Sequence, residues 1–275
     1  MRAFALALWA SLVVAVAFLG IPLAALFLRV PPGELVSQLG SETAREALWV
    51  TVKANAVAQA LVLLVGTPAA YLLATRRFRG RDLVISVLEL PLVLPPAVAG
   101  VALLAAFGRS GLLGGQLEAL GMTIPFTEAA VVIAVCFVSS PFFVRAAITG
   151  FESVDPQLVD AARTLGARAP RVFVRISLPL AAGSLGAGAT LAFARGLGEF
   201  GATIMFAGSL PGVTQTMPLA IYAALDQDFG VALALGSLLV LVSIAILLVT
   251  KALPRWARAL SPSTSTSPSV RSLSS

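Results

Sequence analysis

The chain has 275 residues, of which 58% are hydrophobic and 12% are charged, and its mean hydropathy is +0.96. A soluble domain is typically about 45–50% apolar, so water is excluded as the main solvent of this protein. One cysteine, Cys136, excludes both an internal disulfide and a cysteine cluster for a metal, and the chain has no histidine. Because histidine is the commonest metal ligand, we expect no metal site in this chain.

Six apolar segments are long enough to cross a bilayer, which requires about 20 apolar residues per helix. They cover residues 4–28, 47–74, 83–107, 126–151, 179–208 and 229–253. The first is too long to be the apolar region of a cleaved signal peptide. We therefore predict an all-α polytopic membrane protein with six transmembrane helices in one domain, residues 1–260. Residues 261–275 are rich in Ser, Thr and Pro, which predicts a disordered tail.

The net charge of +6 is distributed unevenly between the connecting segments. Most arginines follow the second, fourth and sixth apolar segments, whereas the alternate segments collect six carboxylates: Glu34, Glu42, Glu46, Glu118, Asp226 and Asp228. The positive-inside rule assigns the arginine-rich segments, and with them both termini, to the cytoplasm. We therefore expect a multi-pass protein of a bacterial or archaeal cytoplasmic membrane. Since topology accounts for the basic charge, a nucleic-acid partner is not expected.

A polar passage, VDAARTLGARAPRVFVRISLPLA, interrupts the apolar sequence from Val159 to Ala181. Asp155-Pro156 is a typical helix start and Gly166 a typical helix stop. Between them an apolar stripe recurs at helical spacing: Leu158, Ala161, Ala162 and Leu165. A second short helix is predicted from Pro170 and looks interfacial. On the residues alone, two helices lying on the lipid surface remain as good an interpretation as a docking surface.

The spacing within this passage resembles the EAA signature of the permease subunits of ABC importers, which have the type I importer fold. The matching positions are Asp160, Ala161, Ala162, Gly166, Ile176, Leu178 and Pro179. The resemblance implies a coupling helix that docks into a groove on a cytoplasmic ATPase subunit. Aspartate stands at position 160 where the family has glutamate, which keeps the charge but shortens the reach.

The chain itself has no phosphate-binding loop, because neither of its lysines, Lys53 and Lys251, follows a glycine. ATP and Mg²⁺ are therefore expected on partner ATPase subunits, and no cofactor is expected on this chain. The stretches 88–114 and 195–225 resemble molybdate and tungstate permeases, with sulfate and thiosulfate permeases as the next relatives. The family implies a homodimer, two cytoplasmic ATPase subunits and an extracytoplasmic oxyanion-binding protein.

Charged residues inside the predicted spans cost roughly 2.5–3.5 kcal/mol each in a lipid environment. Arg195 and Glu199 are four residues apart on one helical face and can pair, either as a structural ion pair or as part of the transport path. Glu89 should lie about 10 Å from the cytoplasmic end of the third span, as a buried partner for an arginine at that end. Together with Thr203, these residues are candidates for the pathway or its gate.

Prolines predict a break in the third span. Pro91, Pro95 and Pro96 remove backbone donors, and broken helices at membrane depth are tolerated where they are buried or line a cavity. Pro95 and Pro96 are therefore also pathway candidates, although plain packing explains them nearly as well. GLGEFG, residues 196–201, matches a dinucleotide fingerprint, but it lies in an apolar span without a preceding strand, so we reject that interpretation.

Two other function classes remain open at this point. A self-sufficient secondary carrier or channel would use Arg195, Glu199 and Glu89 for ion coupling. A membrane scaffold without transport activity would use residues 160–166 to bind a cytoplasmic protein.

Overall fold

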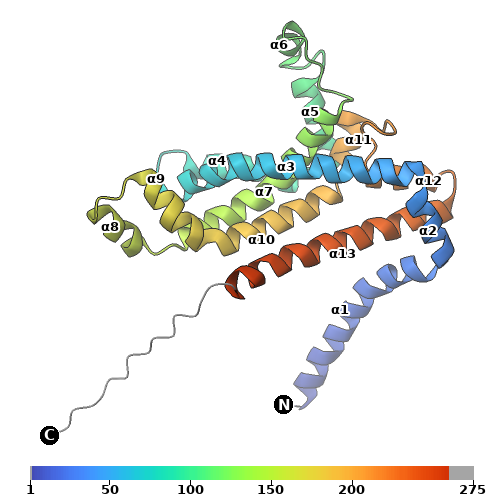
Figure 1. Ribbon diagram of the computed structural model, residues 1–275, viewed down its shortest axis with the longest axis horizontal. Coiled ribbons are helices and arrows are strands. Elements are labelled where there is room, and N and C mark those ends of the chain that lie inside the picture. The colour runs from blue at the N-terminus through green and yellow to red at the C-terminus, as the bar shows by residue number, and fades with distance from the viewer. Residues whose placement is uncertain (1, 260–275) are drawn as a thin grey trace.

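The computed structural model describes residues 2–259, which fold into a bundle of helices (Figure 1). Residue 1 and residues 260–275, with the predicted disordered tail, lie outside the described part. The elements are α1 (Arg2–Leu28), α2 (Pro32–Gly40), α3 (Glu42–Thr75), α4 (Arg81–Val93), α5 (Pro96–Phe107), α6 (Gly114–Ala119), α7 (Glu128–Glu152), α8 (Pro156–Thr164), α9 (Ala169–Val172), the π-helical turn η1 (Phe173–Ser177), α10 (Leu178–Leu197), α11 (Gly201–Ala207), α12 (Met217–Leu225) and α13 (Phe229–Ala259).

Five helical segments are long and apolar enough to cross a membrane, and a bent helix pair is the sixth. The five are α1, α3, α7, the continuous segment α9–η1–α10 and α13, and the bent pair is α4 with α5. No strand occurs between residues 2 and 259. The predicted all-α fold with six spans is therefore confirmed.

Local sequence explains where the central helices α3 and α7 begin. The Ser41 hydroxyl accepts a hydrogen bond from the amide of Ala44 at the start of α3, and Thr127 does the same for Ala130 at the start of α7. Each satisfies one of the amides that a helix N-terminus leaves without a partner.

The centre of the bundle is made by α3, α7 and α10, which run side by side in Figure 1. Small residues allow the close approach. A Cβ on Gly66 of α3 would lie 2.9 Å from the Phe143 ring of α7, and a Cβ on Gly188 of α10 would lie 2.6 Å from the Ala146 Cβ. Such small-residue contacts are the usual way in which helices pack in lipid. The α4 helix covers a further side of α7.

The first helix, α1, lies at the edge of the bundle and diverges from it in Figure 1. It contacts α13, where the Ser237 hydroxyl is 3.4 Å from the Leu26 carbonyl oxygen, but its apolar window has no buried residue. The α1 surface is therefore available to lipid or to another protein chain.

The third span is broken where the prolines predicted it. The axes of α4 and α5 differ by 119° across Leu94 and Pro95, and Pro96 begins the second half. Pro91 lies inside α4, which continues through it. The break therefore falls at the Pro95-Pro96 pair.

The fifth span differs from the predicted segment 179–208. The helix begins at Ala169 and ends at Leu197, and a separate short helix, α11, follows the turn at residues 198–200. The separate interfacial helix expected from Pro170 is therefore wrong, because α9 continues into α10 through the π-helical turn. The amide of Leu178 bonds to the Phe173 carbonyl, five residues back, and Pro179 has no amide to donate in the next turn.

Candidate coupling surface and transport path

The α8 helix forms a projection at one end of the molecule (Figure 1). The Asp155 carboxylate caps it by accepting from the Gln157 amide at 2.9 Å, and Pro156 is its first residue. Gly166 follows the helix with φ +84°, a conformation that a residue with a Cβ adopts at a cost. The start and stop predicted from the sequence are thus confirmed.

No residue of α8 is buried, and its apolar stripe faces outward. Leu158 is 49% exposed, Leu165 is 88% exposed, and Ala161 between them is also exposed. Ala162 is half-buried. An apolar stripe with two small residues at its centre can lie close against a flat or concave partner, which this chain does not supply within residues 2–259.

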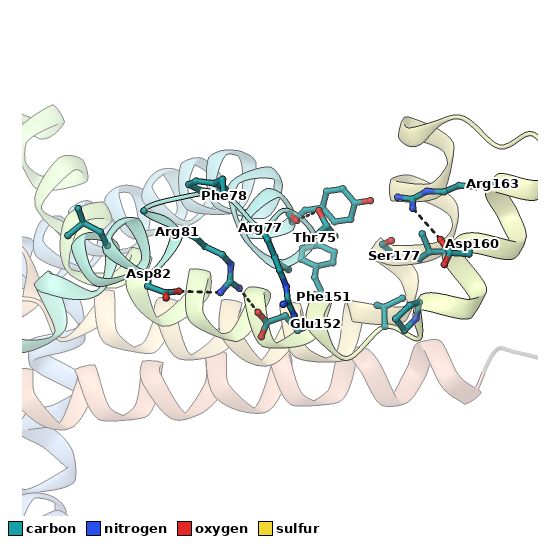
Figure 2. Close-up of a pocket in the computed structure, with 17 residues that line it drawn as sticks. Thr75, Arg77, Phe78, Arg81, Asp82, Phe151, Glu152, Asp160, Arg163 and Ser177 are labelled. Atoms are coloured by element: carbon teal, nitrogen blue, oxygen red, sulfur yellow. Dashed lines mark hydrogen bonds and ion pairs between the residues drawn. The ribbon is translucent and has the colours of Figure 1, made fainter.

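A cavity of about 840 Å³ separates α8 from the bundle (Figure 2). Its far wall is made by the adjoining ends of α3, α4 and α7, where Arg81 donates to Glu152 at 2.5 Å and to the Leu73 carbonyl at 2.6 Å. On the α8 side, Asp160 and Arg163 form an exposed ion pair at 3.3 Å. Asp160 therefore points toward the cavity side of α8 rather than along the apolar stripe.

The remaining signature residues lie in the long helix that follows. Ile176 belongs to η1, and Leu178 and Pro179 begin α10. The signature thus joins two structural parts: an exposed helix, and the π-helical turn at the base of a membrane span. The α8 helix contacts α9 and η1, which are continuous with α10.

The pathway candidates Arg195 and Glu199 are paired, as predicted. Arg195 Nη1 lies 2.7 Å from Glu199 Oε2, and the Glu199 side chain is only 1% exposed. The other carboxylate oxygen accepts from the Ala202 amide at 2.8 Å, in the first turn of α11. Glu199 is therefore both an ion-pair partner and the group that starts α11 after the break.

A buried asparagine that the sequence reasoning missed holds α10 against α3. Asn55 is 2% exposed, and its Nδ2 donates to the Phe193 carbonyl at 3.0 Å. A Cβ on Gly196 would collide with the Asn55 carboxamide, so the glycine permits this contact. An Asn in the middle of an apolar segment was the available signal, because a buried amide needs a partner.

Thr203 is fully buried in α11, and its hydroxyl has no hydrogen-bond partner among the described residues. It lies one turn after Glu199. Thr51, also missed, has a partner: its hydroxyl accepts from the Met217 amide at 2.7 Å and so attaches the start of α12 to α3.

The break between α4 and α5 lies against the break between α10 and α11. A Cβ on Gly201, at the start of α11, would lie 2.5 Å from the Pro96 Cβ at the start of α5. One turn further, a Cβ on Gly100 would lie 2.6 Å from the Met205 Cβ. The broken third and fifth spans therefore form one closely packed unit. GLGEFG lies at this break with no strand before it in the described chain, which agrees with rejecting a dinucleotide site.

Glu89 in α4 pairs with an arginine, as predicted, but the pair is not buried: the Arg145 side chain is 68% exposed and that of Glu89 is 34% exposed. Its Oε1 lies 3.7 Å from Nε of Arg145 in α7. This second ion pair lies nearer the α8 end than Arg195 and Glu199.

A bundle of six spans with an exposed amphipathic helix between the fourth and fifth is the architecture of the permease subunit of an ABC transporter. Solved structures agree in fold. The permease chain of a bacterial ABC transporter that imports alginate superposes with a TM-score of 0.72 at 17% identity, covering 93% of this chain and 96% of the other. The methionine ABC transporter MetNI gives 0.60 at 18% identity, covering 78% of this chain and 95% of the other.

Residues 66–261 match the family described as binding-protein-dependent transport system inner membrane component, and the chain belongs to this family. It is similar to the molybdenum transport system permease protein ModB of Mycobacterium bovis, with 43% identity over 233 residues, or 85% of this chain and 88% of the relative. The protein of the same name from Escherichia coli K12 is 41% identical over 77% of this chain and 92% of its own. The chain is thus a transport subunit and not itself the ATPase.

Proposed function

We propose that this protein is the transmembrane subunit of an ATP-driven importer for a tetrahedral oxyanion, molybdate or the similar tungstate. It works as a homodimer with two cytoplasmic ATPase subunits beneath it and an extracytoplasmic binding protein above it. The observation that carries the ATP-driven mechanism is α8, an exposed helix that bears Asp160, Ala161 and Ala162 and contacts α9 and η1, which continue into a membrane span. The cargo is supported by the relatives named as molybdenum permeases.

In this arrangement the α8 end is cytoplasmic, as are both termini. ATP and Mg²⁺ bind the partner subunits, and their closure moves α8 and, through η1, α10. The Arg195–Glu199 pair, Thr203 and the Pro95-Pro96 break lie around the far end of α10 and form the gate. A route in the permease needs only weak contacts, because an ion must also leave it.

The test is reconstitution of the protein with its ATPase and binding protein in liposomes. Molybdate uptake is expected only with ATP and with all three components present. Uptake by this chain alone under an ion gradient would instead identify a secondary carrier, and absence of uptake with the complete set would contradict a transport function. Titration calorimetry on the binding protein with molybdate, tungstate and sulfate then ranks the anions.

A further inference from the structure

Arg145 is exposed, although it lies on α7, the span with the largest buried share. Between residues 130 and 151 of α7, the exposed side chains are those of Arg145 and Thr149, and the Arg145 side chain is 68% exposed. Arg145 precedes the end of α7 by about two turns, so it lies roughly 10 Å inside the span. A charge exposed to lipid at such a depth is costly. This face of α7 therefore meets water or a second protein chain.

Arg145 and Thr149 expose a strip of the α7 surface that lies between the contacts of α7 with α4 and with α10, and this strip is called the groove below. Glu89 of α4 lies on one side of it. On the other side is α10, because the adjacent Ala146 packs against Gly188. The α3 helix meets α7 at Gly66, which faces Phe143 and Val144, whereas Arg145 stays exposed, so α3 does not cover this strip. The α10 face turned away from α3 is exposed and lined by small and aliphatic residues: Gly183, Ala187, Leu191 and Ala194.

The two arginines differ in how strongly they are held. Arg195 makes a 2.7 Å contact with a carboxylate that is 1% exposed, whereas Arg145 is 3.7 Å from Glu89, whose side chain is 34% exposed. Within residues 2–259 the Arg145 guanidinium makes no hydrogen bond. Its donors therefore remain available to an anion, and a planar guanidinium matches the oxygens of a tetrahedral oxyanion.

The arginines also lie at different depths. Gly188 of α10 packs against Ala146, so it lies at about the same depth as Arg145. Arg195 follows Gly188 on α10 by about two turns, or roughly 10 Å. Residues seven apart on a helix share a face, so Arg195 lies beside the same α7–α10 contact, nearer the middle of the membrane. An anion that leaves the level of Arg195 toward the α8 end meets Arg145 next.

We infer that Arg145 is a second, transient oxyanion contact in the cytoplasmic half of the transport path, with Glu89 as the positioning residue that keeps this contact weak. Glu89 holds the guanidinium toward the groove and competes with the anion, which favours release into the cytoplasm. In a homodimer the second copy supplies an identical pair. This inference rests on the proposed function.

The first test measures the groove without measuring transport. In a Cys136→Ala background of the assembled transporter, Ala187→Cys reports on the groove, and Val65→Cys is the control. Val65 of α3 is 65% exposed. It adjoins Gly66, which packs against Val144, the residue before Arg145. Val65 therefore lies at about the depth of Arg145, on another face of the bundle. Thiol-reactive reagents of negative and positive charge are compared at both positions.

The Ala187→Cys protein is expected to react, with the anionic reagent faster than the cationic one, while Val65→Cys stays unreactive in lipid. Adding Arg145→Gln should lower the anionic-to-cationic rate ratio about tenfold, since a unit charge in a partly dehydrated groove is weakly screened. Molybdate should slow the reaction in the presence of Arg145 only. No reaction at Ala187→Cys, or a ratio that Arg145→Gln leaves unchanged, would overturn the inference.

The second test is molybdate uptake by the reconstituted complex. Arg145→Gln is expected to reduce uptake about tenfold, the usual effect of losing a charged hydrogen-bond donor, while Arg145→Lys keeps part of it. The double variant Glu89→Gln with Arg145→Gln separates the roles: it stays defective if Arg145 contacts the anion and recovers if the pair is only structural. If uptake recovers in the double variant, the inference about Arg145 is wrong but the proposed function stands. If the wild-type complex shows no uptake, the proposed function itself is wrong.

Discussion

At the scale of single residues, Glu199 combines two interactions on one buried carboxylate. One oxygen holds Arg195 and the other accepts the Ala202 amide that begins α11. Loss of Glu199 leaves the Arg195 guanidinium, whose side chain is 28% exposed, without a charged partner, which costs less than the value of about 3–5 kcal/mol typical of a fully buried pair. The carboxylate should therefore be essential to the stability of the break as well as to any gating role.

We predict that Glu199→Gln lowers the free energy of unfolding by about 2 kcal/mol, because the amide retains an acceptor for Ala202 but no longer offers Arg195 a charged partner. Glu199→Ala should cost about 1 kcal/mol more, since the hydrogen bond from the Ala202 amide is lost too. Chemical unfolding of the purified protein in detergent, followed by circular dichroism, measures both.

The matched control for this prediction is the double variant Arg195→Gln with Glu199→Gln. It removes both charges and should be more stable than Glu199→Gln alone, because no buried charge is left unpaired. Equal stability of the wild type and Glu199→Gln would mean that the ion pair contributes nothing to the fold.

At the scale of helices, the contact between α5 and α11 depends on one glycine. Gly201→Ala places a Cβ 2.5 Å from the Pro96 Cβ, closer than two carbon atoms can approach without a shift of one of them. Overpacking of this kind typically costs about 1–3 kcal/mol, so the unfolding midpoint in detergent should fall. Gly198→Ala, three residues earlier and with no atom within 4 Å of its new Cβ, is the control and should leave the midpoint unchanged. If the unfolding midpoint is the same for both variants, α11 can shift away from Pro96 without a loss of stability.

Sequence patterns predicted the helix features that depend on local chemistry. The Asp155 cap, the Gly166 stop and the break at Pro95 all follow from backbone donors and allowed dihedral angles, which a residue carries with it wherever it lies. The break at residues 198–200 was missed because no proline marks it. It depends on Glu199 reaching Ala202 and on Gly201 packing against Pro96, and these are tertiary contacts that the periodicity of an apolar run does not record.

The exposed stripe of α8 gives the prediction for the coupling surface. Ala161→Trp adds a large side chain at the centre of the stripe and should reduce copurification of the ATPase subunit at least about tenfold, because a close contact is sterically blocked. The stability of the permease itself should not change, since no residue of α8 is buried. Pull-down of the partner from detergent-solubilised membranes measures the effect.

Arg163→Trp is the control for the coupling surface. It places the same large side chain on the side that lines the cavity of about 840 Å³, where a tryptophan has room, and it removes only an exposed ion pair. Copurification should stay near that of the wild type. If Ala161→Trp and Arg163→Trp retain equal amounts of the ATPase subunit, the apolar stripe of α8 is not the docking surface.

At the scale of the whole molecule, the sequence predicted the number of spans but not which faces meet. The apolar lengths are sufficient to count six spans. Helical periodicity assigns a face to Arg145 but cannot say whether α4, α10 or lipid lies against it, and the ion pair with Glu89 required a structure. The same holds for α1, whose uniform apolarity gives no sign that it leaves the bundle.

The orientation of the bundle in the membrane gives the last prediction. Arg79 and Asp226 are exposed near opposite ends of α3, a helix about 50 Å long. Arg79 lies in the turn after the C-terminus of α3. Asp226 follows α12, and the hydroxyl of Thr51 attaches α12 to the N-terminal part of α3. The positive-inside rule places Arg79 in the cytoplasm. In a Cys136→Ala background, a membrane-impermeant maleimide should label Asp226→Cys in intact spheroplasts and Arg79→Cys only after permeabilisation. The reverse pattern would place α8 outside the cell, where no cytoplasmic ATPase could reach it, and a transporter coupled through α8 would then be ruled out.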